Sequence, residues 1–499
     1  MRQLFMLAVA ALVFANGCRT AETVYQAESP TGQFDRNEPH VSNAVDSENR
    51  VGAPTRAQVD TRQFKRLPDP NASIIQPVAY QQEQSESPPP IHPAEEIPIP
   101  QPSADHVLTL EQLEQMALDA NPAVAAAGAR VQALRGKWVQ AGLAPNPTIG
   151  YVGEEIGDDG KAGQQGGFVG QQFITGGKLG LNRAVVGQEI AKAEQDWTAI
   201  QQRVLTDVRT GYYDVLIAQR KVSLARELVE VSEHAVKASK ALLEAKEISE
   251  VGLLQTEVEA QNAQILARRA RNENEAAWRR LSSVLGRPDL APQRLDGDLR
   301  VAENGLNWDE QLQRLVTQSP EVAAAVAELE RARWALDRAY AQVKPDVNVQ
   351  VGLQYDNATG DTITGVQVGL PIPLWNKNQG GIQQAQSEIA AAERDMQRVE
   401  LSLRRRLASA FQSYQDASFQ VTKYADDILP KAQRTFDLVS RGYKTGEVGY
   451  LDMLTAQRTY FQTNLAYVES LRELWRSRLR IDGLLLDGSL DEQANRPAE

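Results

Sequence analysis

The chain repeats itself, and this internal repeat constrains its fold more than any short motif does. Asn121-Pro122 recurs as Ser319-Pro320, 198 residues later. Farther along the offset becomes 199, and seven apolar positions of one half align with seven of the other: Ile190, Trp197, Ile200, Val204, Val208, Tyr212 and Val215 with Ile389, Met396, Val399, Leu403, Leu407, Phe411 and Tyr414. Such agreement indicates that one structural unit was duplicated, giving a first repeat over 106–300 and a second over 301–488.

Each repeat is predicted to be mostly helical. Thr109 and Gln112 fit a capping box at the start of the first helix. In the first repeat, apolar spacing predicts further helices over 123–143, 181–246 and 253–285. A helix of about 65 residues is about 100 Å long, which exceeds a compact domain. The long helices must therefore pack side by side.

Four segments alternate apolar and other residues, the period of a strand. They are Thr148–Ile156, Gly167–Ile174, Val347–Tyr355 and Thr364–Ile372. The plan helix–strand–strand–long helix–helix thus occurs twice. Since four strands cannot close a barrel alone, and open edges are forbidden in lipid, a membrane form would need further copies.

The change from strand to long helix in the second repeat has its own chemistry. Pro371 and Pro373 withdraw two backbone donors, which ends pairing in a sheet. Asn376 to Gly381, which includes Gly380, is expected to supply the turn into the helix. The first-repeat counterpart, Gln172–Lys178, has glycines and no proline, so the two junctions are expected to differ.

The first residues resemble an export signal: a basic start, a short apolar run and small residues. We expect a signal peptide over 1–17 and a lipid-modified cysteine at Cys18, although an ordinary signal with an incidental cysteine is the alternative. Composition predicts a lipid anchor followed by a disordered, Pro-rich tether over 18–105, and a disordered tail over 489–499.

The overall composition excludes several functions. Asp and Glu number 65 against 53 Lys and Arg, an acidic balance that argues against a nucleic-acid partner. One cysteine and four scattered histidines argue against a zinc or copper site, and no catalytic or phosphate-binding motif stands out. We therefore expect no enzyme activity and no cofactor. The basic run Arg404–Arg406 is expected to pair with carboxylates of neighbouring helices.

The twofold plan, with Leu370-Pro-Ile-Pro-Leu-Trp-Asn-Lys-Asn-Gln-Gly-Gly381 at its second strand–helix junction, resembles the TolC-like outer-membrane efflux family over residues 106–487. The resemblance is closer to the heavy-metal and multidrug branches than to the protein-secretion branch. It implies an α+β membrane protein in which three chains each lend four strands to a 12-stranded β-barrel. That barrel continues as a periplasmic α-helical barrel.

The same resemblance implies that the two helical turns farthest from the strands contact a periplasmic adaptor. These tip residues are Lys246, Glu247, Ile248, Ser249, Val251, Gly252, Leu253, Gly446, Glu447, Val448, Gly449 and Tyr450. Two alignments of the first tip stay open. One pairs Lys246 with Gly446 at an offset of 200, and the other matches Val251-Gly252-Leu253 to the family's tip motif.

Asp452 falls where the family has an aspartate at the constriction of its closed duct, and Thr455 falls where a second aspartate is common. Three copies of Asp452 would favour cations. The alternative is an ordinary aspartate favoured by the dipole of a first helical turn.

The predicted function is an outer-membrane exit duct of a tripartite efflux system. Its expected partners are two further copies, a periplasmic adaptor, an inner-membrane pump and outer-membrane lipid. The alternatives are a lipid-anchored periplasmic coiled-coil adaptor or scaffold, and a type I protein-secretion duct.

Overall fold

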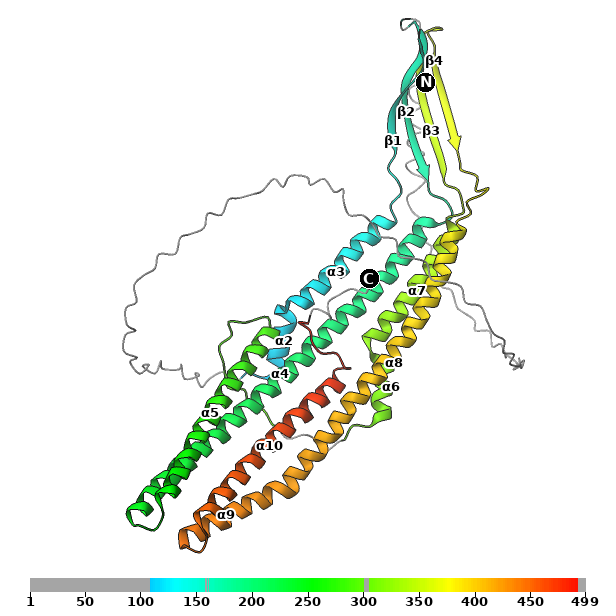
Figure 1. Ribbon diagram of the computed structural model, residues 1–499. Helices are drawn as coiled ribbons and strands as arrows, with labels where there is room; N and C mark the ends of the chain where they lie inside the picture. Colours follow the sequence, from blue (N-terminus) through cyan, green and yellow to red (C-terminus); the bar gives the residue numbers. More distant parts are fainter. Residues whose placement is uncertain (1–107, 158, 160, 300–304, 492–499) are drawn as a thin grey trace, which may run out of the picture. The chain divides into compact units, whose positions relative to one another are not determined.

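The computed structural model describes residues 108–157, 159, 161–299 and 305–491 (Figure 1). The predicted signal peptide, Cys18, the tether and residues 492–499 of the predicted tail lie outside these residues. Residue 300, at the boundary drawn between the repeats, also lies outside them. The tail was predicted to begin at residue 489, but the described structure continues beyond residue 488. Ser489 is fully buried there, and its amide donates a hydrogen bond to Asp207 at 2.7 Å.

The elements follow the predicted twofold plan. In the first repeat they are α2 (Leu110–Ala120), α3 (Pro122–Ala141), β1 (Thr148–Gly157), β2 (Ala162–Phe173), α4 (Lys178–Glu244) and α5 (Glu250–Val284). In the second they are α6 (Trp308–Gln318), α7 (Pro320–Ala341), β3 (Val347–Asp356), β4 (Thr362–Gly369), α8 (Gln379–Lys423), the π-helical turn η2 (Tyr424–Ile428), α9 (Leu429–Thr445) and α10 (Tyr450–Asp482). The duplicated architecture predicted from the sequence is confirmed.

The short helices begin and end as their capping residues predict. Thr109 and Gln112 form the expected capping box of α2. Asn121 both ends α2 and caps α3, its side chain accepting the amide of Ala123 at 2.9 Å. Pro122 then occupies the first turn of α3, where a missing N–H costs nothing. Ser319 likewise precedes Pro320 at the start of α7, but its side chain makes no capping hydrogen bond.

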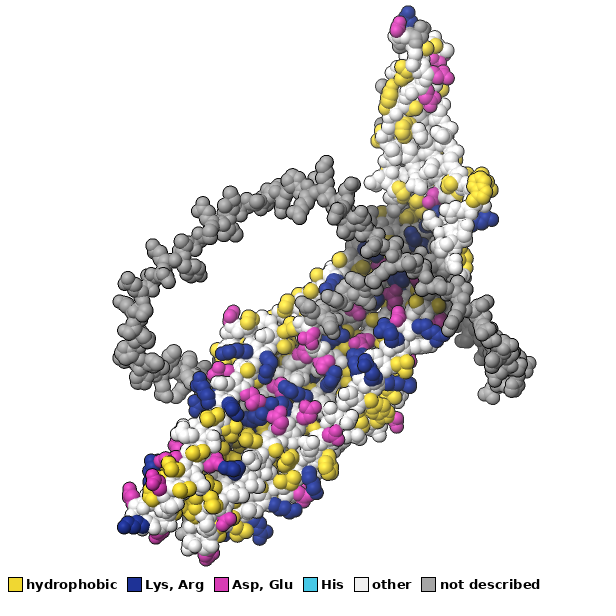
Figure 2. Space-filling model, in the orientation of Figure 1, with side chains coloured by type: hydrophobic (Ala, Val, Ile, Leu, Met, Phe, Trp, Pro, Cys, Tyr) yellow, Lys and Arg dark blue, Asp and Glu magenta, His cyan; other side chains and the backbone are white. Residues whose placement is uncertain are grey.

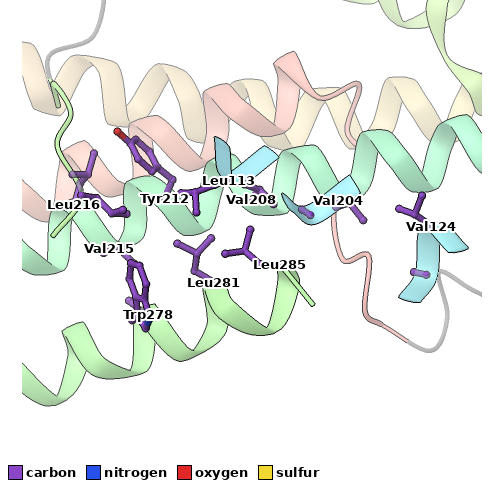
Figure 3. Packing of buried hydrophobic residues seen from close by; sticks show 14 of the residues in the cluster. Leu113, Val124, Val204, Val208, Tyr212, Val215, Leu216, Trp278, Leu281 and Leu285 are labelled. Carbon is purple, nitrogen blue, oxygen red and sulfur yellow. The ribbon is translucent and has the colours of Figure 1, made fainter. Parts of the chain in front are cut away.

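Each repeat has its own apolar core on its long helix. In the first repeat Val204, Val208 and Tyr212 of α4 are buried against α2, α3 and the end of α5 (Figure 3). In the second, the equivalent core contains Leu403, Leu407, Phe411 and Tyr414 of α8, with Ile481 and Leu485 near the end of α10. The predicted alignment of the two long helices therefore joins residues that perform the same packing role.

The second long helix contains a π-helical turn that the first lacks. The offset between repeats is 199 as far as Tyr414 and becomes 200 at the tips, so one residue is added in between. The turn η2 lies in that interval and absorbs it, as a π-bulge does. Pro430 follows in the first turn of α9 and has no amide to donate. The long helix of the second repeat is therefore interrupted once, at η2.

The two repeats are joined through α4 and α10. Tyr213 of α4 and Trp475 of α10 stack with ring centroids 3.7 Å apart. Beside them, charged side chains of α4, α5 and α10 form a cluster consisting of Asp214, Lys221, Glu273, Glu469, Arg472 and Arg476. Burial opposes ionisation of Glu273, but hydrogen bonds and charges from Arg472 and Lys221 outweigh it and lower its pKa.

The strands form one antiparallel sheet of order β1-β2-β3-β4. Its central pair, β2 and β3, joins the two repeats, and β1 and β4 are left as edges. The strands have 10, 12, 10 and 8 residues. β4 ends at Gly369, three residues before the predicted Ile372, because Pro371 and Pro373 cannot donate to a ladder.

Candidate functional site

One face of the sheet is apolar and uncovered. The pairing register places four branched aliphatic residues in one row across all four strands: Ile149, Val169, Val351 and Val366. Large side chains of the same face add Tyr151, Leu353, Tyr355 and Val368, and all eight are exposed. Water does not favour such a continuous apolar surface, so this face is suited to lipid.

The opposite face is rich in glycine and glutamine. The row next to the aliphatic one consists of Gly150, Phe168, Gly352 and Gly365, and a second row contains Gln350 and Gln367. The ring of Phe168 lies across β1, where a Cβ at Gly150 would approach it to 2.5 Å. Glycine at position 150 therefore leaves room for the ring. This face is more polar, as is expected of a surface that meets water inside a duct.

Charged side chains are common on the helices and few on the sheet (Figure 2). Figure 2 shows Lys, Arg, Asp and Glu scattered densely over the helices, whereas the sheet carries hydrophobic side chains and few charges. Of the predicted basic run, Arg406 pairs with Glu321 of α7, and Arg203 of α4 approaches the same carboxylate at 3.4 Å. The expected pairing of this run with neighbouring carboxylates is confirmed for Arg406.

The first strand–helix junction is short and tied down. Residues 174–177 connect β2 to α4, and Gly177 has a positive φ of 72° immediately before the helix. The amide of Thr175 and the ammonium group of Lys178 both donate to Asp346 at 2.9 Å, just before β3. Lys178 is buried, with 7% of its surface exposed. This junction is therefore packed against the second repeat.

The second junction is longer and differs from its prediction in one respect. Residues 370–378 connect β4 to α8, and Asn378 has the positive φ, 53°, that Gly177 has in the first repeat. Gly380 and Gly381 lie inside the first turn of α8, so the predicted turn over Asn376–Gly381 ends sooner. The side chain of Asn378 fixes the chain by donating to the carbonyl of Ala339 at 2.8 Å.

The two tips have the same backbone structure. In the first, the amide of Glu247 donates to the carbonyl of Leu242 at 2.9 Å, and in the second that of Glu447 donates to Gly442 at 2.8 Å. Lys246 and Gly446 occupy the same left-handed position, with φ of 62° and 78°. The matching caps favour the offset of 200, and the alternative motif Val251–Leu253 lies in the first turn of α5.

The predicted tip residues differ in exposure. Lys246, Glu247, Ser249, Val251, Gly446, Glu447 and Gly449 are exposed, whereas Ile248, Gly252, Leu253, Val448 and Tyr450 are partly buried. Tyr450 is turned toward the chain itself, since its hydroxyl is hydrogen-bonded to Thr256 of α5. Val448 packs toward Gly442, where a Cβ would meet it at 2.6 Å. Among the large apolar side chains of the predicted tips, Val251 is therefore the one that is mostly exposed, at 62%.

Asp452 and Thr455 lie on the first two turns of α10. Both are exposed, and Gly449 occupies the N-cap position of the helix. The hydroxyl of Thr455 donates to the carbonyl of Leu451 at 2.8 Å, so it is engaged within the helix. The Oδ2 atom of Asp452 lies close to Gly449, 3.4 Å from the position that a Cβ on this glycine would take.

Two features are absent from the residues that the structure describes. None of their helices combines the length and apolar character needed to span a bilayer. Among the same residues, no group of three or more His, Cys, Asp and Glu side chains could hold a metal ion.

The sheet, with one apolar face and one face rich in glycine and glutamine, suits one class of protein, a channel of the outer membrane. The model of the family described as "Outer membrane efflux protein" matches the chain twice, over residues 113–287 and 311–485. The chain belongs to this family. The two matches also correspond to the two structural repeats. The resemblance, the fold class, the efflux-channel function and the outer-membrane location predicted from the sequence are thereby confirmed.

Individual relatives agree with the family match. The cobalt-zinc-cadmium resistance protein CzcC of Cupriavidus metallidurans is 27% identical over 380 residues, covering 76% of this chain and 90% of CzcC. Among solved structures, the outer-membrane channel OprN has a TM-score of 0.64 at 17% identity, covering 76% of this chain and 90% of that one. CusC has the same TM-score and identity, covering 80% of this chain and 99% of that one.

Proposed function

We propose that three copies of this chain close one duct, through which an inner-membrane pump and a periplasmic adaptor pass their cargo out of the cell. The observation that carries the proposal is the two-faced sheet. One face is apolar and exposed, the other is rich in glycine and glutamine, and β1 and β4 have free edges. In lipid these edges need partners, and β4 of one copy can pair with β1 of the next.

The helices support the same closure. Away from the sheet they pack in the order α5, α4, α10, α9, so α5 and α9 are the outer members of the layer. On α5, Val251, Leu254, Val258 and Ile265 are spaced by 3, 4 and 7 residues and are all more than half exposed. Leu438 of α9 is 52% exposed. Such a seam on an outer helix suits packing against a helix of another copy.

The tips and Asp452 complete the proposed duct. The exposed tip residues around Glu247 and Glu447 would contact the adaptor. Asp452, exposed on the first turn of α10, would line the narrowest part of the duct, with Thr455 one turn on. Three carboxylates at one level favour cations over anions. Lipidation at Cys18 would add an anchor to the same membrane.

For the cargo we propose divalent metal ions. The support is the relative CzcC, whose name states resistance to cobalt, zinc and cadmium and which this chain matches over 90% of its length. The duct itself is passive and performs no catalysis. Deleting the gene is expected to sensitise cells to these metals; unchanged metal tolerance together with sensitivity to drugs would contradict this cargo.

Planar-bilayer recording tests the duct. The purified protein should form cation-preferring channels, and Asp452→Ala should raise conductance or weaken that preference. Glu250→Gln is the matched control, because it removes one carboxylate from the first turn of the equivalent helix α5. If both variants behave like the wild type, Asp452 does not line the narrowest part of the duct. If neither the wild type nor the variants conduct, the protein does not form a duct.

A further inference from the structure

The loop between β4 and α8 exposes four large apolar side chains in six residues. Leu370, Ile372, Leu374 and Trp375 are 53%, 71%, 62% and 87% exposed. Trp375 is the most exposed large apolar side chain in the described part of the chain. Figure 2 shows this loop as a hydrophobic projection beside the end of the sheet.

The exposure is not the result of a loose backbone. The amide of Leu374 donates to the carbonyl of Ile372 at 2.9 Å, and the side chain of Gln379 donates to the carbonyl of Trp375 at 3.2 Å. Asn378 is tied to α7, and two prolines fix their own φ angles. The fold thus holds these side chains outward at the cost of exposing them to water.

The first repeat has no such loop. Its junction over 174–177 carries one large apolar residue, Ile174, which is partly buried. Both junctions connect a strand to a long helix through a left-handed residue. The extra apolar residues of the second repeat are therefore not required to make the connection.

We propose that the loop 370–375 is a membrane-interface anchor, which places Trp375 at the level of the lipid headgroups on the periplasmic side. The loop continues from the strand that carries Val366 and Val368 on the lipid-facing side of the sheet. The indole of tryptophan favours this level, since its ring is apolar and its N–H is polar. The inference rests on the membrane insertion of the sheet.

Charge in the same segment agrees with lipid as the occupant. Lys377 is exposed two residues after Trp375, and residues 370–381 contain no Asp or Glu. A cation beside exposed apolar side chains suits phosphate headgroups above an acyl layer. A second copy of the chain is the competing occupant, and the experiment below distinguishes the two.

The test measures quenching of tryptophan fluorescence by phospholipids brominated near the headgroup. The protein is reconstituted as the assembled full chain, and the wild type is compared with Trp375→Phe. With seven tryptophans in the chain, the wild type should show extra quenching of about one seventh of its emission. A tryptophan introduced by Tyr151→Trp in the Trp375→Phe background, measured with phospholipids brominated deeper in the acyl chain, reports whether the sheet itself lies in lipid.

The outcomes separate the two hypotheses. Extra quenching in the wild type supports the anchor. Equal quenching of the wild type and Trp375→Phe, with clear quenching of the introduced tryptophan, overturns the anchor and leaves the membrane sheet in place. Equal quenching together with loss of the oligomer in Trp375→Ala assigns the loop to a neighbouring copy. If the introduced tryptophan is not quenched either, the sheet does not lie in lipid, and the anchor proposal that rests on its insertion is refuted with it.

Discussion

Two adjacent residues of β3 allow a direct test of the two-faced sheet. Val351 lies in the aliphatic row, fifth in the strand Val347–Asp356, while Gln350 lies in a row of the opposite face. Val351→Lys therefore places a charge among Val169 and Val366, whereas Gln350→Lys places the same charge on the glutamine-rich face. The two variants differ in position by one residue and have the same charge and backbone.

The expected difference is large. A lysine on the lipid face near the middle of a membrane costs about 2–4 kcal/mol, whereas a lysine facing a water-filled lumen stays hydrated and changes selectivity instead. In an assembly of three chains the three sites are far apart, so their costs add to about 6–12 kcal/mol for Val351→Lys. Such a loss is comparable with the whole stability of many folded proteins.

The assay is urea-dependent refolding into lipid vesicles, followed by the heat-modifiable migration of the oligomer on gels. We expect Val351→Lys to abolish the oligomer or shift its midpoint strongly to lower urea, and Gln350→Lys to resemble the wild type. Equal losses in the two variants would refute the assignment of lipid and lumen faces. A larger loss for Gln350→Lys would reverse it.

Two further predictions concern the helices. Lys246 and Gly446 share one left-handed position. Gly446→Ala should therefore lower the unfolding free energy by about 1 kcal/mol, whereas Lys246→Gly should leave it unchanged or raise it by up to about 1 kcal/mol. Thermal unfolding of the helices measures both changes, and a change of the same sign in both variants would contradict the shared geometry. Folding lowers the pKa of Glu273, so its pairing with Lys221 and Arg472 stabilises the helices above its ordinary pKa of 4.5 and is lost as pH falls below it. The wild type should lose more stability than Glu273→Gln between about pH 5 and pH 3, and parallel losses in circular dichroism melts would show that this carboxylate does not matter.

Sequence alone was sufficient for the features that depend on neighbouring residues. The capping box of Thr109 and Gln112, the breaks at Pro122 and Pro320, and the helix and strand periodicities all concern contacts within a few positions. The duplication was also readable, because both copies retain the same apolar positions on their long helices. These local patterns and one long-range repeat fixed the order of the elements.

Some local details still required the structure. The glycines at 380 and 381 suggest a turn, yet they lie in a helix because Asn378 takes the left-handed position before them. The sequence indicates the π-helical turn only through the offset between the repeats, which changes from 199 to 200. Tyr450 was expected at a contact surface, but its hydroxyl is bound to Thr256, which is 194 residues away in the chain.

The two faces of the sheet are the clearest case of what tertiary structure decided. Alternation within Val366 and Val368 shows that β4 has two sides, but it does not say which residues of the other strands share a side. That depends on the pairing register, and Val169 meets Val351 only because two strands from different repeats lie next to each other. The apolar row, and with it the lipid-facing surface, exists only after the repeats have packed together, because no segment of the chain contains it alone.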